Sequence, residues 1–549
     1  MAKKNDTVLV KNASVLMIAA LVSKIIGMIY KSPLSSTIGS ETMACFTYAQ
    51  NAYLILLMIA SFSIPQAVSK VMAEKIAFRR YRDAQRVFKA ALLYAVIAGG
   101  IAALICLFGA NLLVPDNMAN ARLALRFLAP TIFLSGILGV FRGYFQAYRN
   151  MMPTSLSQII EQIFVAVVAL AASGIMVAHF QGKGEDALQQ WGAAGATMGT
   201  GAGVLAALLF MLFVYWVNRN TIRKKIRRDR ASKDESYSEV MKYLLLIMTP
   251  IILSAFIYNV NSFINSYMYT FILGKRGVDG GVLKVMYAEY GYFMTLINIP
   301  LTLAGTAPTS MIPEVSGLYA RGNLDAANEK TIQATWISMI ISIPSAVGLM
   351  LLANKVVQII FPVSNGMGGS LMIVGAVMII LNSNSNISNG VLQGIGKPEI
   401  PMINAAISLV VNMIVLLVML CFTKLGIYSV VIAMIIYSIL ICVLNDISMK
   451  KYMNFKNPWK YAYVQPLLAC VPMAAVVVIS DFLMGLILPE RIFGSYTVSM
   501  AISAVVSIAL AVIVYFIAYL AISKPTEEDL SYVPGGGMIV RFGRKLHLC

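Results

Sequence analysis

Two stretches of this sequence resemble each other, and the resemblance decides the fold. Residues 64–93 read "IPQAVSKVMAEKIAFRRYRDAQRVFKAALL", and residues 307–336 read "APTSMIPEVSGLYARGNLDAANEKTIQATW". In each stretch a proline within an apolar segment, Pro65 or Pro308, is followed by an Asp-Ala pair at nearly the same distance. We interpret the two stretches as copies within an internal repeat.

A second pair of motifs supports the repeat. Gly-x-x-Gln followed by a proline occurs in "GYFQAYRNMMP" from Gly143 and in "GVLQGIGKPEIP" from Gly390. The offset is 243 residues for the prolines of the first pair and 247 residues for the glycines of the second. Two pairs in the same order, with nearly the same offset, favour duplication over coincidence.

The composition indicates an integral membrane protein. Of 549 residues, 59% are hydrophobic and 12% are charged, whereas about a quarter of a soluble domain is charged. No ten-residue alternating pattern suggests a β-barrel, so the spans are predicted to be helices. Each span needs roughly 20 apolar residues. Fourteen segments qualify: 10–35, 43–72, 88–113, 122–142, 155–178, 192–217, 241–272, 286–314, 332–353, 368–392, 402–422, 426–446, 461–487 and 496–522.

The charges predict the orientation. With both termini, the loops on one side of the membrane hold 31 of the 43 Lys and Arg residues. Positive loops remain in the cytoplasm, so both termini are expected there. The net charge of +19 then indicates contact with anionic membrane lipids and not with nucleic acid. We expect a multi-pass membrane protein.

The repeat groups the helices into two lobes. Six helices form one unit, and because six is even, both copies enter the membrane in the same direction. Their pseudo-two-fold axis is therefore predicted to run along the membrane normal. The expected fold is all-α and polytopic, with two six-helix lobes and two additional C-terminal helices. The predicted parts are an N-lobe (1–220), a basic cytoplasmic linker (221–240), a C-lobe (241–447), two appended helices (448–523) and a cytoplasmic tail (524–549).

Two lysines interrupt the first apolar segment. In "SKIIGMIYK" (23–31), Lys24, Gly27 and Lys31 share one helical face. A charge in the middle of a lipid-facing helix costs about 3 kcal/mol or more, so both lysines are expected to face water, a partner or an anionic ligand. The alternatives are a structural ion pair for Lys24 and extension of Lys31 to the outer interface. Two lobes create a central cavity, which is where such cations are expected.

Other polar residues within the spans have two interpretations each. Lys70 and Glu74 form either a simple pair one turn apart or part of the cavity, and Arg126 is close enough to its helix end to reach the interface. The asparagine side chains within the spans are expected either to join helices through hydrogen bonds or to line the cavity. The glutamates are expected to pair with cavity cations, to bind a coupling ion or to contact solvent. The candidate cavity or coupling residues are Glu161, Asn259, Asn265, Glu314 and Arg126.

The sequence offers no enzymatic motif. It contains no P-loop, paired-His zinc motif or nucleophile elbow, so neither ATP hydrolysis, a catalytic residue nor a metal site is expected. "GATMGTGAG" (195–203) lies within an apolar helix without a preceding strand, which predicts close helix packing and not a nucleotide loop. The six cysteines have no metal or redox spacing.

The motifs "SKIIGMIYKSPL", "SIPQAVSKVMAE" and "GYFQAYRNMMPTSLSQIIEQI", together with fourteen helices, resemble the multidrug/oligosaccharidyl-lipid/polysaccharide exporters. Within that superfamily the chain resembles the MurJ-type lipid II flippases and their stage V sporulation protein B relatives. The resemblance covers the first twelve helices. It implies a flippase, not an enzyme, that moves an undecaprenyl-diphosphate-linked cell-wall precursor to the outer leaflet by alternating access.

The resemblance also implies a site. Lys24 and Lys31 stand near positions where the family has arginines that line a cationic cavity and engage the lipid diphosphate. Lysine keeps the charge but loses the bidentate phosphate geometry. Lys70 is the candidate for a further cation in the second helix, whereas no central cation is evident in the eighth helix, where the family has one.

The expected partner is a lipid-linked oligosaccharide, handled by a monomer or alongside cell-wall synthesis machinery. No cofactor is expected. Transport is expected to be driven by a Na⁺ or H⁺ gradient or by the membrane potential and not by ATP. The alternatives are a flippase for another lipid-linked polysaccharide repeat unit, a cation-coupled multidrug antiporter of the same fold, and a polytopic glycosyltransferase or polymerase. The excess of Lys over Asp and Glu in the N-lobe spans argues against the antiporter, and the short outer loops argue against the glycosyltransferase.

Overall fold

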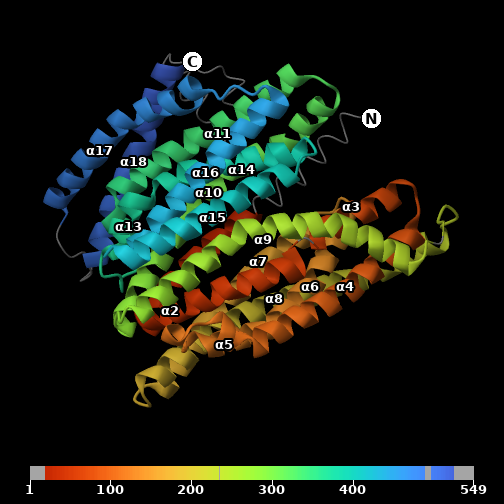
Figure 1. Ribbon diagram of the computed structural model, residues 1–549, viewed down its shortest axis with the longest axis horizontal. Coiled ribbons are helices and arrows are strands. Elements are labelled where there is room, and N and C mark those ends of the chain that lie inside the picture. Colours follow the sequence, from red (N-terminus) through yellow and green to blue (C-terminus); the bar gives the residue numbers. More distant parts are fainter. Residues whose placement is uncertain (1–18, 63, 234, 489–495, 525–549) are drawn as a thin grey trace. The chain divides into compact units, whose positions relative to one another are not determined.

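The computed structural model describes residues 19–62, 64–233, 235–488 and 496–524. These residues form helices joined by short loops and contain no β-strand, as Figure 1 shows. The all-α fold expected from the composition is confirmed. Most of the predicted tail, 525–549, and the N-terminal residues 1–18 lie outside the described residues.

The chain divides into two compact units, the first ending at Ala288 and the second beginning at Glu289. The boundary lies inside a long helix, α10, and not in the basic linker. The first unit begins with the helix Ala19–Ile29. Its further helices are α2 (Lys31–Leu57), η1 (Met58–Phe62), α3 (Ile64–Ala77), α4 (Tyr81–Phe108), α5 (Ala110–Leu113), η2 (Asp116–Met118), α6 (Ala121–Ala147), α7 (Met152–Phe180), α8 (Glu185–Arg227), α9 (Tyr237–Lys275) and the start of α10 (Gly280–Ala320).

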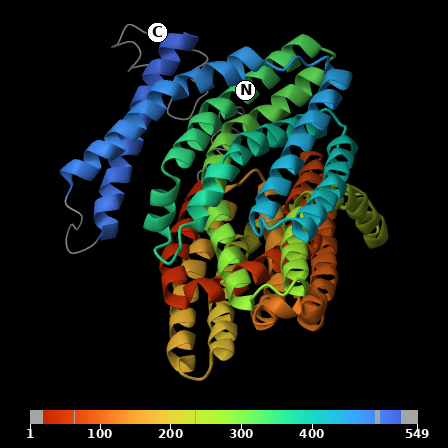
Figure 2. The same cartoon turned by 60° about the vertical axis from the view of Figure 1, so that its left-hand side comes forward.

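The second unit contains the remainder of α10. It continues with α11 (Leu324–Leu351), α12 (Ala353–Ile360), α13 (Met367–Gly375), α14 (Val377–Gly394), α15 (Glu399–Phe422), α16 (Tyr428–Met453), η3 (Trp459–Val464), α17 (Gln465–Ile487) and α18 (Tyr496–Ser523). The predicted appended helices correspond to η3–α17 and α18, which lie side by side in Figures 1 and 2. They pack on α11, where the Trp336 indole donates a hydrogen bond to the Tyr519 hydroxyl at 2.5 Å.

Length and hydropathy identify ten membrane spans among the described residues, or eleven if the bent pair α13–α14 is one span. The other three expected segments are 10–35, which begins before the described residues, and the segments of α9 and α10, in which several side chains are not described. Each of the fourteen expected segments nevertheless coincides largely with helix wherever it is described.

Two residues explain breaks in the first two expected helices. Gly39 has φ 77° and ψ 166°, a conformation that interrupts the helix and separates the first span from the second. The second span changes to a π-helix over Met58–Phe62 and resumes as α3 at Ile64. Pro65 lacks an N–H, and its ring clashes with the carbonyl four residues earlier, which accounts for the change.

Glycines allow α8 to lie directly on α7. A Cβ added at Gly195, Gly199 or Gly203 would meet the α7 backbone; at Gly199 it would lie 2.6 Å from the Val165 carbonyl oxygen and 2.6 Å from the Ala169 Cβ. The three glycines are four residues apart and share one face. The close packing predicted for this motif is confirmed, and Figure 1 shows α7 and α8 running together.

The repeat motifs make equivalent contacts within each unit. A Cβ at Gly143 of α6 would lie 2.8 Å from the Pro65 carbonyl oxygen of α3. In the second unit, a Cβ at Gly390 of α14 would meet the Ile312 side chain, four residues after Pro308 in α10. In both copies the glycine therefore packs against the helix that carries the repeat proline.

The linker between α8 and α9 is bound to the start of α4. The Asp229 carboxylate accepts hydrogen bonds from the Arg82 amide at 2.7 Å and from the Ser232 hydroxyl at 2.6 Å. The fully buried Asp83 carboxylate accepts one from the Lys233 amide at 2.9 Å, and its own amide donates to Ser232 Oγ at 3.2 Å. We call this set of contacts the linker clamp.

The electrostatics of Asp229 follow from the clamp. Burial alone would raise the pKa of Asp229, but hydrogen bonds from the Ser232 hydroxyl and from the amides of Arg82, Ala231 and Ser232 lower this pKa to about 2. The folded pKa is below the ordinary value of 3.8. The stabilisation is therefore present above about pH 4 and is lost as the pH falls through about 2.

We predict opposite effects of alanine at two glycines. Gly199→Ala is expected to lower the thermal unfolding temperature in detergent, because its methyl group meets the α7 backbone and overpacking costs about 1–3 kcal/mol. Gly174→Ala, whose Cβ meets nothing within 4 Å, should be neutral or raise the temperature, since alanine favours helix by up to about 1 kcal/mol. Equal shifts for the two variants would contradict this packing.

For the clamp, we predict that Asp229→Asn accelerates tryptic cleavage of the linker at neutral pH. Hydrogen bonds to a charged group contribute about 1.5–3 kcal/mol, so the open population should rise roughly tenfold or more. Digestion of purified protein, followed by mass spectrometry, measures the rate. Asp116→Asn is the control, because that side chain is 96% exposed; an Asp229→Asn rate matching the control would refute the clamp.

Candidate functional site

The two lysines of the first span lie on one continuous helical path. Lys24 is exposed in the helix Ala19–Ile29, and Lys31, half-buried, is the first residue of α2. Helical hydrogen bonds continue across the junction, from the Tyr30 amide to the Ile26 carbonyl at 3.1 Å and from the Leu34 amide to the Tyr30 carbonyl at 3.1 Å. The lysines are therefore about 10 Å apart along the axis and on the same face.

That face is directed toward α7. A Cβ added at Gly27 would lie 3.1 Å from Nε2 of Gln162 in α7. Gly27 is three residues after Lys24 and four before Lys31, so all three share the face that meets the amide. The sequence predicted the shared face and a polar face around Gln162; the contact between the two is a finding of the structure.

Next to Gln162, Glu161 is held by a cation that the sequence analysis missed. Its carboxylate pairs with the Arg142 guanidinium at 2.6 Å, and Arg142 Nε donates to Ser157 Oγ at 2.9 Å. The Arg142 and Glu161 side chains are 16% and 27% exposed. Arg142 is the last residue of the expected span 122–142, and α6 extends beyond it to Ala147. Its position directly before the repeat glycine Gly143 was the available signal.

The predicted cations Lys70 and Arg126 are both exposed. Within the described residues no ion pair joins Lys70 to Glu74, whose carboxylate instead accepts a hydrogen bond from the Tyr243 hydroxyl at 3.2 Å. Arg126 donates to the Asn111 side chain at 3.2 Å near the start of α6. Neither of these contacts links Lys70 or Arg126 to Lys24 or Lys31.

The predicted amides in α9 differ in exposure. Asn259 is exposed, whereas Asn265 is fully buried. Beside Asn265, the Ser266 hydroxyl accepts a hydrogen bond from the Tyr287 hydroxyl at 2.7 Å, and Asn51 of α2 donates to Tyr287 at 2.8 Å. This part of α9 thus takes part in polar contacts that join α2, α9 and α10.

A second polar cluster joins helix ends and includes residues that were not predicted. The Gln189 side-chain amide of α8 donates to the Glu41 carboxylate at 2.7 Å, and Lys284 of α10 donates to Gln189 Oε1 at 2.6 Å. The Lys284 ammonium lies 3.9 Å from Glu41. By the predicted topology these residues lie at the outer ends of their helices.

In the second unit, the carboxylates of Glu289 and of the predicted candidate Glu314 both have partners. Glu289 is fully buried and accepts hydrogen bonds from the Ser364 hydroxyl at 2.6 Å and the Gly368 amide at 2.7 Å, which stabilises the start of α13. The predicted candidate Glu314 is 54% exposed and lies 3.5 Å from Lys330. No group of His, Cys, Asp and Glu suited to a metal ion is found within the described part of the chain.

We predict that Glu161→Gln destabilises the first unit. Removing the carboxylate leaves the Arg142 charge largely buried, which should cost up to about 3 kcal/mol and lower the unfolding temperature by several degrees. Adding Arg142→Met should recover most of the loss, which a double-mutant cycle measures. Glu314→Gln is the matched control and should change little, because its pair is longer and more exposed. An additive cycle would contradict the pairing.

Comparisons with known proteins agree with this structure. The polysaccharide biosynthesis protein family matches residues 9–319, more than half of the chain, and the MatE family matches residues 250–418. Stage V sporulation protein B of Bacillus subtilis (strain 168) is 25% identical over 96% of this chain and 98% of its own length. Lipid II flippase MurJ of the same organism is 22% identical over 74% of this chain and 76% of its own length.

A solved structure of lipid II flippase MurJ in an inward closed conformation has the same fold. It superposes with a TM-score of 0.63 at 15% identity and covers 91% of this chain and 98% of that chain. The MurJ relative and the solved MurJ structure are flippases and not enzymes. Because the polysaccharide biosynthesis protein model matches more than half of the chain, the chain belongs to that family.

Proposed function

We propose that this protein is a flippase that carries a lipid-linked cell-wall precursor, with undecaprenyl diphosphate as the lipid anchor and lipid II as the first candidate, from the inner to the outer leaflet. The observation that carries the proposal is the face shared by Lys24 and Lys31, with the Gln162 amide opposite Gly27. Two cations and an amide suit a diphosphate, which needs charge compensation and hydrogen-bond donors.

The physical reason lies in the cost of moving charge through the membrane. A diphosphate transferred into hydrocarbon would lose its hydration, and ammonium groups along a hydrated passage offset part of that cost. The polyprenyl tail needs no such passage, because it can remain in lipid. In this proposal, alternating access exposes the headgroup first to the inside and then to the outside, and an ion gradient or the membrane potential resets the cycle.

The relatives support the same assignment. One relative is a lipid II flippase, and the matching family model is that of polysaccharide biosynthesis proteins. A flippase for another lipid-linked polysaccharide unit uses the same diphosphate chemistry and is the alternative cargo. The proposed location is the bacterial cell membrane, with both termini in the cytoplasm.

The MatE match favours a cation-coupled drug antiporter as the second candidate. Cationic drugs and coupling ions require intramembrane carboxylates. Glu161 is paired with Arg142, Glu289 accepts hydrogen bonds from Ser364 and the Gly368 amide, and Glu314 lies beside Lys330. Because these three carboxylates already have partners, we favour the anionic cargo.

The decisive experiment is complementation of a strain depleted of its lipid II flippase. Lys24→Ala should abolish growth rescue while the protein reaches the membrane in normal amount, because each 1.4 kcal/mol of lost diphosphate stabilisation slows flipping about tenfold. Lys24→Arg should retain rescue, since it keeps the charge.

The matched control is Lys424→Ala, which removes an exposed lysine between α15 and α16 and should rescue fully. Binding of purified protein to lipid II and to an analogue with a neutral headgroup gives the second measurement. Full rescue by Lys24→Ala, or equal binding of the two lipids, would refute the proposed role of Lys24 in binding the diphosphate.

A further inference from the structure

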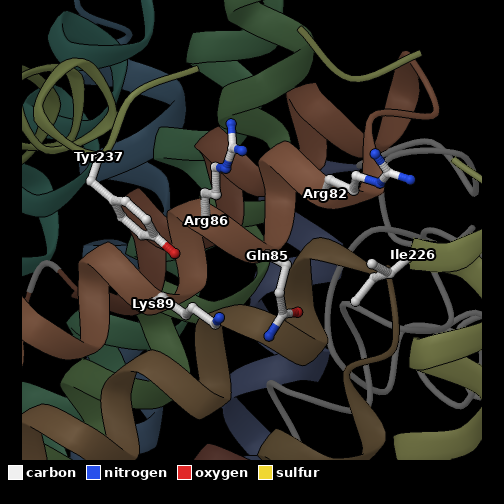
Figure 3. Close-up of a pocket in the computed structure, with 6 residues that line it drawn as sticks. All are labelled: Arg82, Gln85, Arg86, Lys89, Ile226 and Tyr237. Atoms are coloured by element: carbon white, nitrogen blue, oxygen red, sulfur yellow. The ribbon is translucent and has the colours of Figure 1, made fainter. Parts of the chain in front are cut away.

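The cytoplasmic end of α4 carries a row of polar side chains. Arg82, Gln85, Arg86 and Lys89 are spaced i, i+3, i+4 and i+7, so they share one helical face. Together with Ile226 of α8 and Tyr237 just after the linker they line a cavity of about 180 Å³. Figure 3 shows the four residues following one another along α4, with Tyr237 beyond one end of the row and Ile226 beyond the other. We call this cavity the basic pocket.

The basic pocket has a strongly positive lining. Three of its six lining residues are cations and none is acidic. Three carboxylates near the pocket already have partners. Asp83 binds the Lys233 amide and lies 3.8 Å from Arg86, Asp229 accepts hydrogen bonds from the Arg82 amide and the Ser232 hydroxyl, and Glu235 pairs with Lys75 at 2.5 Å. The pocket therefore retains a net positive charge toward solvent.

The three cations of the basic pocket differ in how firmly neighbouring groups hold their side chains. Arg86 donates to the Glu235 backbone carbonyl at 2.8 Å and lies 3.8 Å from Asp83, which fixes its guanidinium as part of the wall. Arg82 and Lys89 are exposed, and within the described residues neither side chain takes part in an ion pair. These two side chains are available to an anion, and the Tyr237 hydroxyl, on a ring that is 52% exposed, adds a hydrogen-bond donor.

Beyond the pocket, the same face of α4 becomes apolar. Leu93, Ile97, Leu104 and Phe108 continue the spacing and are 55%, 53%, 55% and 75% exposed. From Lys89 to Phe108 the helix rises about 28 Å, close to the roughly 30 Å thickness of a bilayer core. Lys89 therefore lies at the inner boundary of the hydrocarbon, where headgroup phosphates are found.

We propose that the basic pocket binds the phosphate of an anionic glycerophospholipid of the inner leaflet, whose acyl chains lie along the exposed apolar face of α4. Free phosphate would satisfy Arg82 and Lys89 but would leave that face without a ligand. A phospholipid provides a ligand for both the cations and the apolar face. Its phosphate would contact Arg82 and Lys89, and its acyl chains would follow the apolar face of α4. The site is independent of the transported cargo.

The position of the basic pocket gives the lipid a structural effect. Its walls come from α4, the end of α8 and the start of α9, which are the segments that the linker clamp joins. A bound phosphate would join two of these walls, α4 through Arg82 and Lys89 and α9 through Tyr237. Lipid binding should therefore stabilise the attachment of the linker to α4.

The test uses the full-length protein in a neutral detergent. Native mass spectrometry and thermal unfolding measure binding of phosphatidylglycerol, of phosphatidylcholine as the neutral lipid, and of inorganic phosphate. Phosphatidylglycerol should bind and raise the unfolding temperature more than the other two. In the variant Arg82→Gln/Lys89→Gln its affinity should fall roughly thirtyfold, because a cation near a membrane surface contributes about a factor of five.

The matched control is Arg223→Gln/Lys224→Gln, which removes the same charges from exposed positions on α8 that do not line the basic pocket. It should bind phosphatidylglycerol as the unmodified protein does. Three outcomes would overturn the site: equal losses in the two variants, which indicate general surface electrostatics; unchanged binding in the pocket variant; or inorganic phosphate stabilising as much as the lipid, which indicates a phosphate site without lipid.

Discussion

The cost of placing charge inside a membrane governs this structure. A charged group within a span must be compensated, because the surrounding lipid cannot hydrate it. Arg142 and Glu161 compensate each other between α6 and α7, and Lys355 of the short helix α12 compensates Asp481 within the span α17. Glu289 takes its compensation from backbone amides and a hydroxyl instead. These arrangements hold particular helices together, so the electrostatic constraint also specifies which helices are neighbours.

The site shows what the same constraint means for transport. Lys24 and Lys31 stand on a face that an amide approaches at Gly27, where the absence of a side chain leaves space. The Arg142 and Glu161 side chains are largely buried, whereas Lys24 is exposed. That exposure suits a group that an anionic headgroup has to reach.

Much of the fold could be predicted because it depends on properties that are local in sequence. Long apolar segments fold as helices whatever lies beside them, and glycines four residues apart must create a flat face, as Gly195 and Gly199 do on α8. The repeat was visible for the same reason. The ends of helices were harder to predict. Helix α6 continues through Arg142 to Ala147, because Arg142 forms tertiary contacts that hydropathy does not reveal.

The contacts that could not be predicted join residues far apart in the chain. Arg142 and Glu161 are 19 residues apart, but Asp229 and Arg82 are 147 apart and Lys75 and Glu235 are 160 apart. Periodicity does not encode such pairings. The linker illustrates the consequence. Its charges predicted a basic cytoplasmic segment, but they did not predict that Asp229 of the linker is buried against the start of α4 and accepts a hydrogen bond from the Arg82 amide.

The linker clamp and the repeat contacts together suggest how the first unit keeps its shape. Gly143 on Pro65 fixes α6 against α3, Gly199 on Val165 fixes α8 against α7, and the clamp returns the chain from α8 to the start of α4 before α9 begins. Contacts of these two kinds differ in their response to the environment. Glycine packing depends on shape and is insensitive to pH, whereas the clamp depends on the ionised Asp229 carboxylate, which low pH protonates. The clamp is therefore the part of this unit whose stability responds to pH.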